Sequence, residues 1–281
     1  MPAESAHNPA RRNASNLRAR VLERIEAYYD AVPRSGARVE EHGPLRLFVA
    51  EDVPWPYYAR PAGGDVTADD VAAVRRRQWT LGLPEAFEWV VDLAPTLGPA
   101  ARATGLHVDE LPLMALDRPP PRAALDARVR RLEPHDPELA ASRAVADIAF
   151  KAPGTAPGEA GPRERQAALR GFPEPRLRAV RARMAAGLTV TVVAEEGDGV
   201  MAVGSHQPVG GVTEVVGVGT LPAARRRGLG AAVTAALVDD ARRGGAEIVF
   251  LSAGGDDVAR LYERLGFERV GTAGLAAPVS S

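Results

Sequence analysis

The most informative segment of the chain is VGVGTLPAARRRGLGAAVTAAL, residues Val216–Leu237. A run of valines and glycines ends at Thr220, a proline and three arginines follow, and an alanine-rich helical pattern begins near Gly228. The first N–H groups of a helix have no intrahelical acceptor and carry the positive end of the helix dipole. Glycines there let an anion approach the backbone, so the stretch predicts a cradle for a diphosphate. The alternative is a tight strand-to-helix turn beside a solvated arginine patch.

Two other phosphate-binding loops do not fit this stretch. A Walker A loop needs the sequence Gly-Lys-Ser/Thr, and Val216–Leu237 contains no lysine. A Rossmann loop has its first glycine directly after the strand, whereas Leu221–Arg227 intervenes here, and no acidic ribose ligand follows at the expected place.

The composition is that of a globular protein. The 281 residues are 46% hydrophobic and 25% charged, with a formal net charge of −1. Such a chain has no overall field that would attract nucleic acid or an anionic membrane. The absence of cysteine excludes disulfides, thiolate metal sites and a cysteine nucleophile, and it fits a cytoplasmic location. No run approaches the ~20 apolar residues of a membrane span, and the N-terminus lacks the apolar segment of a secretory signal.

A proline-rich segment, Asp117–Arg122, divides the chain. Its three consecutive prolines resist both helix and sheet and lie between two patterned regions. We therefore expect a disordered tail at residues 1–15, one domain at residues 16–120 and a second at residues 121–281. A further Pro/Gly-rich stretch, Ala152–Pro162, predicts a mobile loop inside the second domain.

The second domain has a clear order of elements, which hydrophobic periodicity, turn signals and glycine stops define. The predicted elements are helices 136–150 and 174–186, strands 188–195, 200–205 and 212–220, a helix 228–243, a strand 247–252, a helix 256–266 and a strand from 267. This order predicts a mixed α/β fold, an antiparallel meander that becomes a βαβ unit.

The first half has a similar but less regular pattern. The predicted elements are a helix 17–31, strands 38–41, 45–51 and 56–60, a helix 69–81, a strand 87–92, a helix 95–104 and a strand 107–116. In each half a strand precedes a helix that ends in a glycine and a large apolar residue, Gly105-Leu106 and Gly266-Phe267. This similarity indicates a weak internal repeat, limited to the latter part of each half.

Two motifs on these elements resemble the GNAT (Gcn5-related N-acetyltransferase) superfamily. The first is Arg/Gln-x-x-Gly-x-Gly/Ala at a helix start, after a strand that ends V-x-P-like; here RRRGLG, Arg225–Gly230, follows the sequence TLP. The second is L-Y-x-x-x-G-F on a late helix, matched by LYERLGF, Leu261–Phe267. The resemblance covers Val129–Ala276 and implies a GNAT fold for the second domain, preceded by a smaller GNAT-like α/β domain.

The resemblance also implies a cofactor, acetyl-CoA or another acyl-CoA, and no metal. Its pyrophosphate would be held by the backbone N–H groups of Arg225, Arg226, Arg227, Gly228, Leu229, Gly230 and Ala231. The strand that ends at Thr220 would splay from strand 247–252, and the pantetheine would pair with the exposed edge at Val218, Gly219 and Thr220. An amide there would polarise the thioester carbonyl.

Two residues match the family's general acid and base. Tyr262 corresponds to the acid that protonates the departing thiolate, because a phenol is a donor whose acidity is near that of a thiol. The alternative is an aromatic packing residue on an amphipathic helix. Glu214 lies six residues before Thr220, where histone-type members have the base. The alternative is that Glu214 is a glutamate common to the family without that role.

The chain departs from the family in several places. Gly255 and Val258 stand where the family often has Asn and Ala, which puts side-chain contacts to pantetheine in doubt. The first half has no R-x-x-G-x-G motif, so we expect a degenerate domain that has lost its cofactor site. The five histidines, among them His206, lack metal-ligand spacing and are interpreted as structural or exposed. Six aromatic residues either wall an acceptor pocket between the domains or, as we prefer, fill the core of the first half: Trp55, Tyr57, Tyr58, Trp79, Phe87 and Trp89.

The predicted function is transfer of an acetyl group from acetyl-CoA to a primary amine by direct attack in a ternary complex. The expected partners are the acyl-CoA and an amine acceptor, either a small molecule or a protein lysine, and a homodimer is one option; no nucleic acid or membrane partner is expected. The alternative is a non-catalytic acyl-CoA-binding sensor or scaffold, which would need neither Tyr262 nor Glu214. The acceptor is not identified, because fold does not specify substrate.

Overall fold

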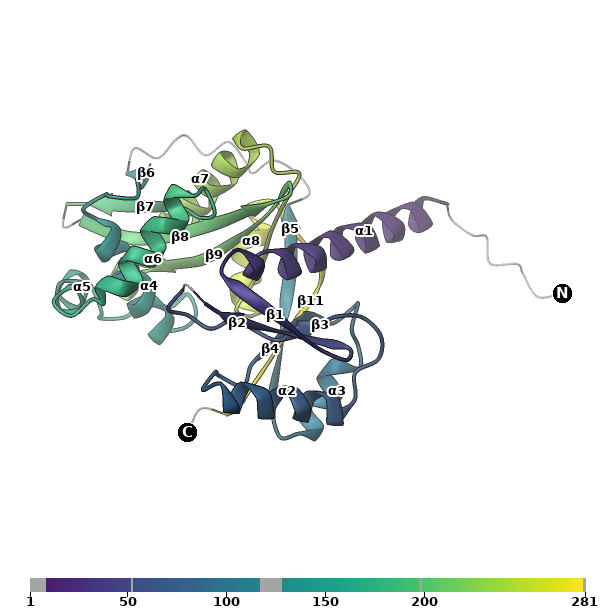
Figure 1. The fold of residues 1–281 in the computed structure, drawn as a ribbon. Coiled ribbons are helices and arrows are strands. Elements are labelled where there is room, and N and C mark those ends of the chain that lie inside the picture. The colour runs from purple at the N-terminus through teal and green to yellow at the C-terminus, as the bar shows by residue number, and fades with distance from the viewer. Residues whose placement is uncertain (1–8, 52, 117–127, 198, 280–281) are drawn as a thin grey trace.

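The computed structural model describes residues 9–51, 53–116, 128–197 and 199–279 (Figure 1). The described chain forms one sheet of three strands and one of eight, with helices packed on both faces of the larger sheet. The predicted mixed α/β class is therefore confirmed. The proline segment at which we divided the chain lies outside the described residues.

The elements of the first half follow the prediction closely, except before the second helix. They are α1 (Pro9–Ala31), a 3₁₀ turn (Pro33–Ser35), β1 (Ala37–His42), β2 (Leu45–Ala50), β3 (Arg60–Pro61), α2 (Ala68–Thr80), β4 (Phe87–Val90), α3 (Leu97–Ala103) and β5 (His107–Leu116). We expected a strand at 56–60, but β3 is only two residues long, because the prolines around it cannot donate to a ladder. Thr67 caps α2 in a reciprocal pair with Asp70, as its position predicts.

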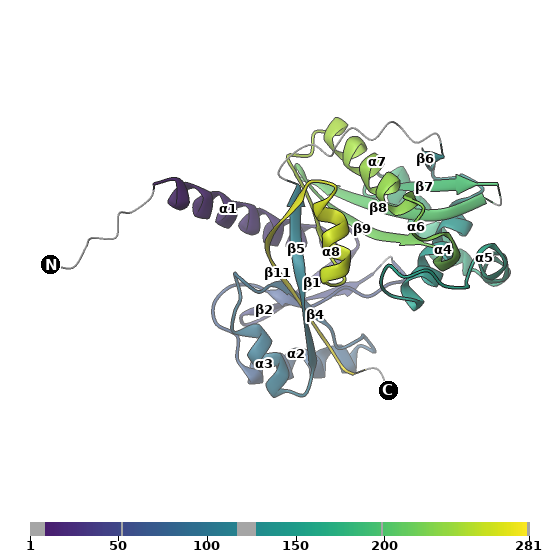
Figure 2. The ribbon, with the colours of Figure 1, turned by 180° about the vertical axis from the view of Figure 1, so that it is seen from behind.

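Helix α1 begins earlier than expected. Residues 9–15, which we assigned to a disordered tail, are helical. Pro9 stands at the first helical position, where no N–H is needed, and the alanine and arginines that follow are good helix formers. Residues 1–8 lie outside the described residues. The N-terminal end of α1 leads away from the rest of the protein (Figures 1 and 2), and buried side chains begin at Leu22.

The second half has the predicted order, with two elements that the sequence pattern did not reveal. The elements are β6 (Val129–Arg131), α4 (Leu139–Lys151), α5 (Pro162–Leu169), α6 (Glu174–Ala185), β7 (Val190–Glu196), β8 (Gly199–Val209), β9 (Val212–Thr220), a 3₁₀ turn (Pro222–Ala224), α7 (Leu229–Arg243), β10 (Ile248–Ser252), α8 (Asp256–Glu263) and β11 (Phe267–Ala277). The unpredicted elements are β6, which is too short to show periodicity, and α5, which lacks an apolar stripe.

The eight-stranded sheet joins the two halves, in the order β4-β11-β5-β10-β9-β8-β7-β6. Strand β11 pairs antiparallel with both β4 and β5, and β5 pairs antiparallel with both β11 and β10. Each half thus inserts its last strand between two strands of the other half. The sheet is continuous across the boundary that we expect near residue 120, and the division into two domains stays a prediction.

The order of elements repeats between the halves, with β1-β2-β3-α2-β4-α3-β5 corresponding to β7-β8-β9-α7-β10-α8-β11. Thr213 of β9 pairs in parallel with Val249 of β10. At the corresponding place in the first half, Ala59 forms an isolated parallel bridge with Phe87 of β4. The two ladders are therefore counterparts, which supports the interpretation of an internal repeat.

The two faces of the large sheet are covered by different helices. Val249 and Leu251 of β10 belong to the same core cluster as residues of α7 and α8. Phe250, between them, packs instead with Tyr28 and Tyr29 of α1. This alternation is the normal period of a strand. Figure 1 views the face that bears α1, and Figure 2 the face that bears α8.

Candidate active site

The corner between β9 and α7 presents a row of unpaired backbone donors. Gly228 is the N-cap of α7 and has left-handed backbone angles, with φ 79°. The N–H of Arg225 closes the preceding 3₁₀ turn at 3.3 Å, and the N–H of Ala232 donates to the Gly228 carbonyl at 3.0 Å. Between them, the N–H groups of residues 226–231 donate to no acceptor in the described part of the chain. Such a row at a helix N-terminus is suited to an anion.

Backbone geometry explains the residue types at this corner. A Cβ at Gly230 would lie 3.3 Å from Oγ1 of Thr220, so a side chain there would crowd the end of β9. Arg226 has φ 65° and is the only residue other than glycine with a positive φ in the described ranges. A left-handed conformation costs a non-glycine residue about 1–2 kcal/mol, and such strain is typical of functional sites.

The guanidinium of Arg225 is a structural clamp. It donates to the carbonyl oxygens of Ala149 at 3.2 Å, Ala152 at 2.5 Å and Ala156 at 2.9 Å. Burial lowers the pKa of Arg225. Its side chain therefore ties the C-terminal end of α4 to the strand–helix corner, and together with its N–H it has little capacity left for an anion.

The segment from Ala152 to Pro162, which we expected to be mobile, is irregular but tied to the same corner. Besides the bonds from Arg225, the N–H of Gly158 donates to the Pro222 carbonyl at 3.1 Å, and the N–H of Ala223 donates to the Ala160 carbonyl at 3.0 Å. These bonds connect the segment to the corner, and the sequence pattern gave no sign of them.

The other two arginines remain accessible. Arg226 is exposed and makes no hydrogen bond or ion pair within the described ranges. Arg227 is also exposed, and its guanidinium pairs with Glu196 at 2.5 Å. Both stand beside the unpaired N–H groups, so they add positive charge that would favour an anion at this corner.

One edge of β9 is open beside this corner. The ladder between β9 and β10 consists of three pairs and ends at Glu214 and Phe250. From Val215 to Thr220 the strand pairs only with β8, so its other edge, which includes Val218, has no strand partner among the described residues. A bulge at Gly217, φ 64°, shifts the register there. This edge could hold an extended ligand by strand-like hydrogen bonds.

Gly219 and its neighbours fix helix α4 over this edge. A Cβ at Gly219 would lie 2.8 Å from the Cβ of Ala149, so glycine is needed for α4 to lie across β9. Leu229, the first residue of α7, is buried in the core below the corner, and Ala231 is partly buried. The structure therefore brings together at one corner all the residues in which we predicted a cofactor site.

Glu214 lies at the last β9–β10 pair, on the face that bears α1. Its Oε1 accepts a 3.2 Å hydrogen bond from the hydroxyl of Tyr29, and its N–H donates to the hydroxyl of Tyr28 at 3.3 Å. The pKa of Glu214 is raised to about 8, chiefly by burial and also by the charge of Glu88, while Arg60 and the Tyr29 hydrogen bond oppose the rise. A carboxyl group with such a pKa can exchange a proton near neutral pH.

Three groups beside Glu214 come from the first half, and sequence reasoning missed them. Arg60 is 5% exposed, is paired with Glu88, and stacks its guanidinium 4.1 Å from the ring centroid of Tyr29. Arg60, Glu88 and Tyr29 escaped prediction because they lie on three separate elements and belong to no local motif. One signal could have found Arg60: it follows Ala59 as Glu214 follows Thr213, so it takes the place of Glu214 in the repeat.

Tyr262 lies on the other face of the sheet. It belongs to the core cluster of α7 and α8, and its ring contacts Phe267 edge-on with centroids 5.7 Å apart. Its hydroxyl has no hydrogen-bond partner in the described ranges, and it is not among the buried polar atoms that lack one. Burial of the ring raises the pKa of Tyr262 to about 12, so its hydroxyl keeps its proton at physiological pH. The ring of Tyr262 therefore packs in the core while its hydroxyl remains available as a donor.

The remaining aromatic residues have mixed roles. Phe87 and Trp89 are fully buried, as the core interpretation predicts. Trp79 is 77% exposed and Tyr58 39%, which that interpretation does not account for. Trp55 packs against the core of the second half, and Tyr57 approaches Gly36.

His206 is structural, one of the two roles expected for it. It is buried, with Nδ1 2.9 Å from Oγ1 of Thr213 and Nε2 3.0 Å from Oδ2 of Asp240. No group of three or more His, Cys, Asp or Glu residues suited to a metal ion occurs in the described ranges. Across those ranges, no helix combines the length and the apolar character that a bilayer crossing requires.

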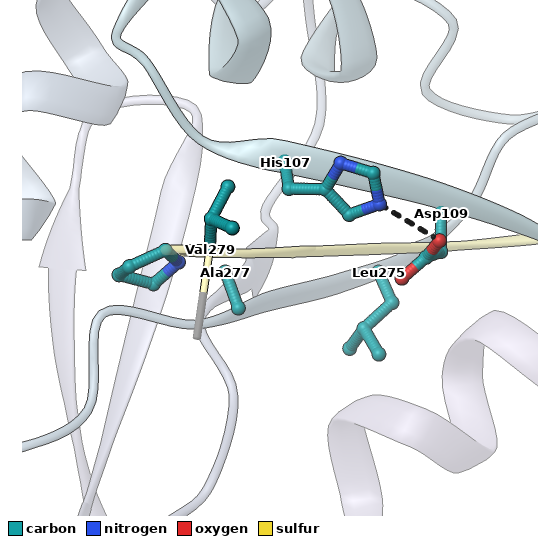
Figure 3. Close-up of a pocket in the computed structure, with 6 residues that line it drawn as sticks. His107, Asp109, Leu275, Ala277 and Val279 are labelled. Carbon is teal, nitrogen blue, oxygen red and sulfur yellow. Dashed lines mark hydrogen bonds and ion pairs between the residues drawn. The ribbon is translucent and has the colours of Figure 1, made fainter. Parts of the chain in front are cut away.

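A separate hollow lies at the outer ends of β5 and β11. Its lining includes His107, Asp109, Leu275 and Val279, and the His107 ring meets the Asp109 carboxylate at 3.0 Å (Figure 3). None of the residues in which we predicted a site lines it. Its polar groups already bond to each other, so it does not compete with the β9–α7 corner as the candidate site.

Comparisons with known proteins agree with this geometry. Residues 161–267 match the model of a family described as the acetyltransferase (GNAT) family. A GCN5-related N-acetyltransferase from Kribbella flavida is similar in structure, with 23% identity and a TM-score of 0.68, over 93% of this chain and 96% of that one. No curated protein sequence matches.

Two further solved structures extend over both halves of the chain. A tandem GNAT protein from the clavulanic acid biosynthesis pathway has 15% identity and a TM-score of 0.52, over 84% of this chain and 79% of that one. A functionally unknown conserved protein from Staphylococcus epidermidis ATCC 12228 has 11% identity and a TM-score of 0.55, over 88% and 95%. At these identities the likeness shows the fold, and the predicted fold is confirmed.

Proposed function

We propose that the chain is an acyltransferase that transfers an acetyl group from acetyl-CoA to a primary amine, in keeping with the match of residues 161–267 to the model of the acetyltransferase (GNAT) family. The observation that supports this most strongly is the position of Glu214 and Tyr262. Glu214 forms the last β9–β10 pair, on the face that bears α1, and Tyr262 packs with α7 and α8 on the opposite face. A thioester held there would have a base on one side and an acid on the other.

The corner between β9 and α7 is suited to the CoA moiety. The unpaired N–H groups of residues 226–231 would hold the pyrophosphate, and Arg226 and Arg227 would add charge-assisted contacts. The open edge of β9 at Val218–Thr220 would pair with the pantetheine amides. Acetyl-CoA supplies the activated acyl group, and the chain's own residues supply position and proton transfer.

The reaction proceeds by direct attack in a ternary complex. Glu214 accepts a proton from the ammonium group of the acceptor, which frees the amine lone pair. The amine nitrogen forms a bond to the acyl carbon, and the bond from that carbon to sulfur breaks. The hydroxyl of Tyr262 donates its proton to the departing thiolate, so charge does not accumulate on sulfur. The nitrogen then loses its second proton, which neutralises the tyrosinate, and Glu214 returns its proton to solvent. The products are an acetamide and free CoA.

The first half lacks the features of a second cofactor site, in keeping with a tandem arrangement whose first domain is degenerate. Helix α2 is the counterpart of α7, but its first turn carries Asp69 and Asp70. The carboxylate of Asp70 and the side chain of Thr67 bond to each other's backbone N–H groups in a capping box. Negative charge and occupied donors both oppose a phosphate there.

Release of free thiol from acetyl-CoA tests this function, with acceptors drawn from four classes: a diamine, an amino acid, an aminoglycoside and a lysine peptide. We expect steady release with at least one acceptor and an acetylated product by mass spectrometry. Saturable binding of acetyl-CoA with no thiol release for any acceptor would instead favour a sensor or scaffold. The absence of both binding and release would contradict the proposal.

A further inference from the structure

Arg60 is a buried cation that belongs to the first half but faces the candidate site of the second. Its side chain is paired with Glu88, yet its Nε and Nη1 atoms are buried and have no hydrogen-bond partner among the residues that the structure describes. Burying a guanidinium with incomplete pairing is costly. A fold that needed only packing at this place would be more stable with an apolar residue.

A chain of contacts leads from Arg60 to the carboxylate of Glu214. The guanidinium lies 4.1 Å from the ring centroid of Tyr29, and the hydroxyl of Tyr29 donates to Oε1 of Glu214 at 3.2 Å. The ring of Tyr29 is held in turn by Phe250, with centroids 5.4 Å apart and the rings nearly perpendicular. The Tyr29 hydroxyl is thus fixed in direction by a cation on one side and an aromatic edge on the other.

We propose that Tyr29 and Arg60 are positioning residues that the first half contributes to the second, and that they hold the Glu214 carboxylate in place and favour its ionised form. This inference rests on the proposed role of Glu214 as the base. It gives the degenerate half a direct part in the reaction. In the first half, Arg60 occupies the position that corresponds to Glu214 in the second half, and its positive charge favours the ionised form of Glu214.

The groups that favour ionisation of Glu214 and those that oppose it lie in one cluster around its carboxylate. The charged and titratable groups that face Glu214 or its tyrosine neighbours are Glu26, Tyr28 and Tyr29 of α1, Tyr58 before β3, Arg60 of β3, Glu88 of β4 and Arg183 of α6. Glu88 opposes ionisation of Glu214, whereas Arg60 and the Tyr29 hydroxyl favour it. Burial raises the pKa of Tyr29, so its hydroxyl remains a donor.

The expected shifts in the titration midpoint of Glu214 have opposite signs, which purely structural roles for these residues would not produce. The titration of Glu214 is followed by ¹³C NMR of protein labelled at the glutamate carboxyl carbon, with the signal assigned by its loss in Glu214→Gln. We expect Tyr29→Phe and Arg60→Gln each to raise the midpoint by about 0.5 pH unit or more, and Glu88→Gln to lower it by a similar amount. Arg60→Lys, which keeps the charge, should stay near the wild-type midpoint.

Tyr28→Phe is the matched control, because its hydroxyl bonds to the Gln207 carbonyl at 2.7 Å and to the N–H of Glu214, not to the carboxylate. It should leave the midpoint unchanged. If Arg60→Gln does not fold, Tyr29→Phe and Glu88→Gln still give opposite shifts. Shifts of one sign in all variants, or no shift in Tyr29→Phe, would overturn the inference.

Activity separates this inference from the proposed function. The acidic limb of kcat/KM should move in the same order as the NMR midpoints, while the affinity for acetyl-CoA stays constant. If Glu214→Gln keeps full activity, Glu214 is not the base and the proposed mechanism fails, whereas the NMR midpoints still decide whether Tyr29 and Arg60 act on Glu214.

Discussion

Glu214 pairs with Phe250 at the last rung of the ladder between β9 and β10, and no further pair joins these two strands. The carboxylate therefore lies where the sheet opens, within reach of a ligand that follows the free edge of β9. Because Phe250 packs against α1 while its neighbours on β10 pack against α7 and α8, the same rung also separates the side of the proposed base from the side of the proposed acid.

The pH dependence of catalysis should show the raised pKa of Glu214. As the proposed base, Glu214 would be active only when ionised, and its pKa is about 8 rather than the ordinary 4.5. We expect kcat/KM to rise about tenfold per pH unit below this value and to level off above it. Glu214→Gln should lower kcat/KM about 100-fold or more and remove this limb. A limb centred near pH 4.5 in the wild type would contradict the assignment.

Tyr262→Phe separates the acid role from the packing role. The substitution keeps the ring that contacts Phe267 and removes only the hydroxyl. We expect kcat to fall about 100-fold or more, with the affinity for acetyl-CoA and the unfolding midpoint nearly unchanged. Steady-state kinetics and thermal unfolding measure the two effects. An unchanged kcat would leave Tyr262 as a packing residue.

Arg225→Met should reduce stability more than its position in a cofactor motif suggests. It removes the donor for the carbonyl oxygens of Ala149, Ala152 and Ala156. We expect the free energy of unfolding in urea to fall by about 2 kcal/mol, since hydrogen bonds from a charged group are lost together. Arg243→Met is the control: its exposed pair with Asp239 should contribute less than about 0.5 kcal/mol. An equal loss of unfolding free energy in Arg225→Met and Arg243→Met would contradict the structural role of Arg225.

Arg226→Gly should have opposite effects on stability and binding. Glycine adopts φ 65° without strain, so we expect the free energy of unfolding to rise by about 1 kcal/mol. Loss of the guanidinium should weaken binding of CoA roughly tenfold. In Arg227→Gly, where no positive φ is relieved and the pair with Glu196 is lost, both quantities should fall. Unchanged CoA affinity in Arg226→Gly would remove this side chain from the anion site.

The sequence was most informative where one short segment determines both structure and chemistry. The glycines and arginines from Arg225 to Gly230 predicted the corner, and the valine-rich run that ends at Thr220 predicted the strand before it. Both are local patterns. The different tasks of Arg225 and Arg226 could not be predicted, because they depend on carbonyl groups of α4 and on one backbone angle.

Long-range relationships were beyond prediction for a different reason. The pairing of β11 with β4 and β5 joins residues more than a hundred positions apart, and no local pattern specifies it. The surroundings of Glu214 depend on this exchange, since Arg60 and Tyr29 reach it only when the first half lies against β9. Burial of a charged residue, which identifies Arg60, is likewise a property of the folded chain and not of its sequence.

Calorimetric titration with acetyl-CoA tests the cradle most directly, using the wild type, Gly230→Glu and Gly171→Glu. Gly230 lies among the unpaired N–H groups, and a Cβ there would lie 3.3 Å from Thr220 Oγ1, whereas Gly171 is exposed and a Cβ there would meet nothing within 4 Å. We expect saturable binding by the wild type and by Gly171→Glu, and none by a folded Gly230→Glu. Undiminished binding by Gly230→Glu would contradict the proposed cradle.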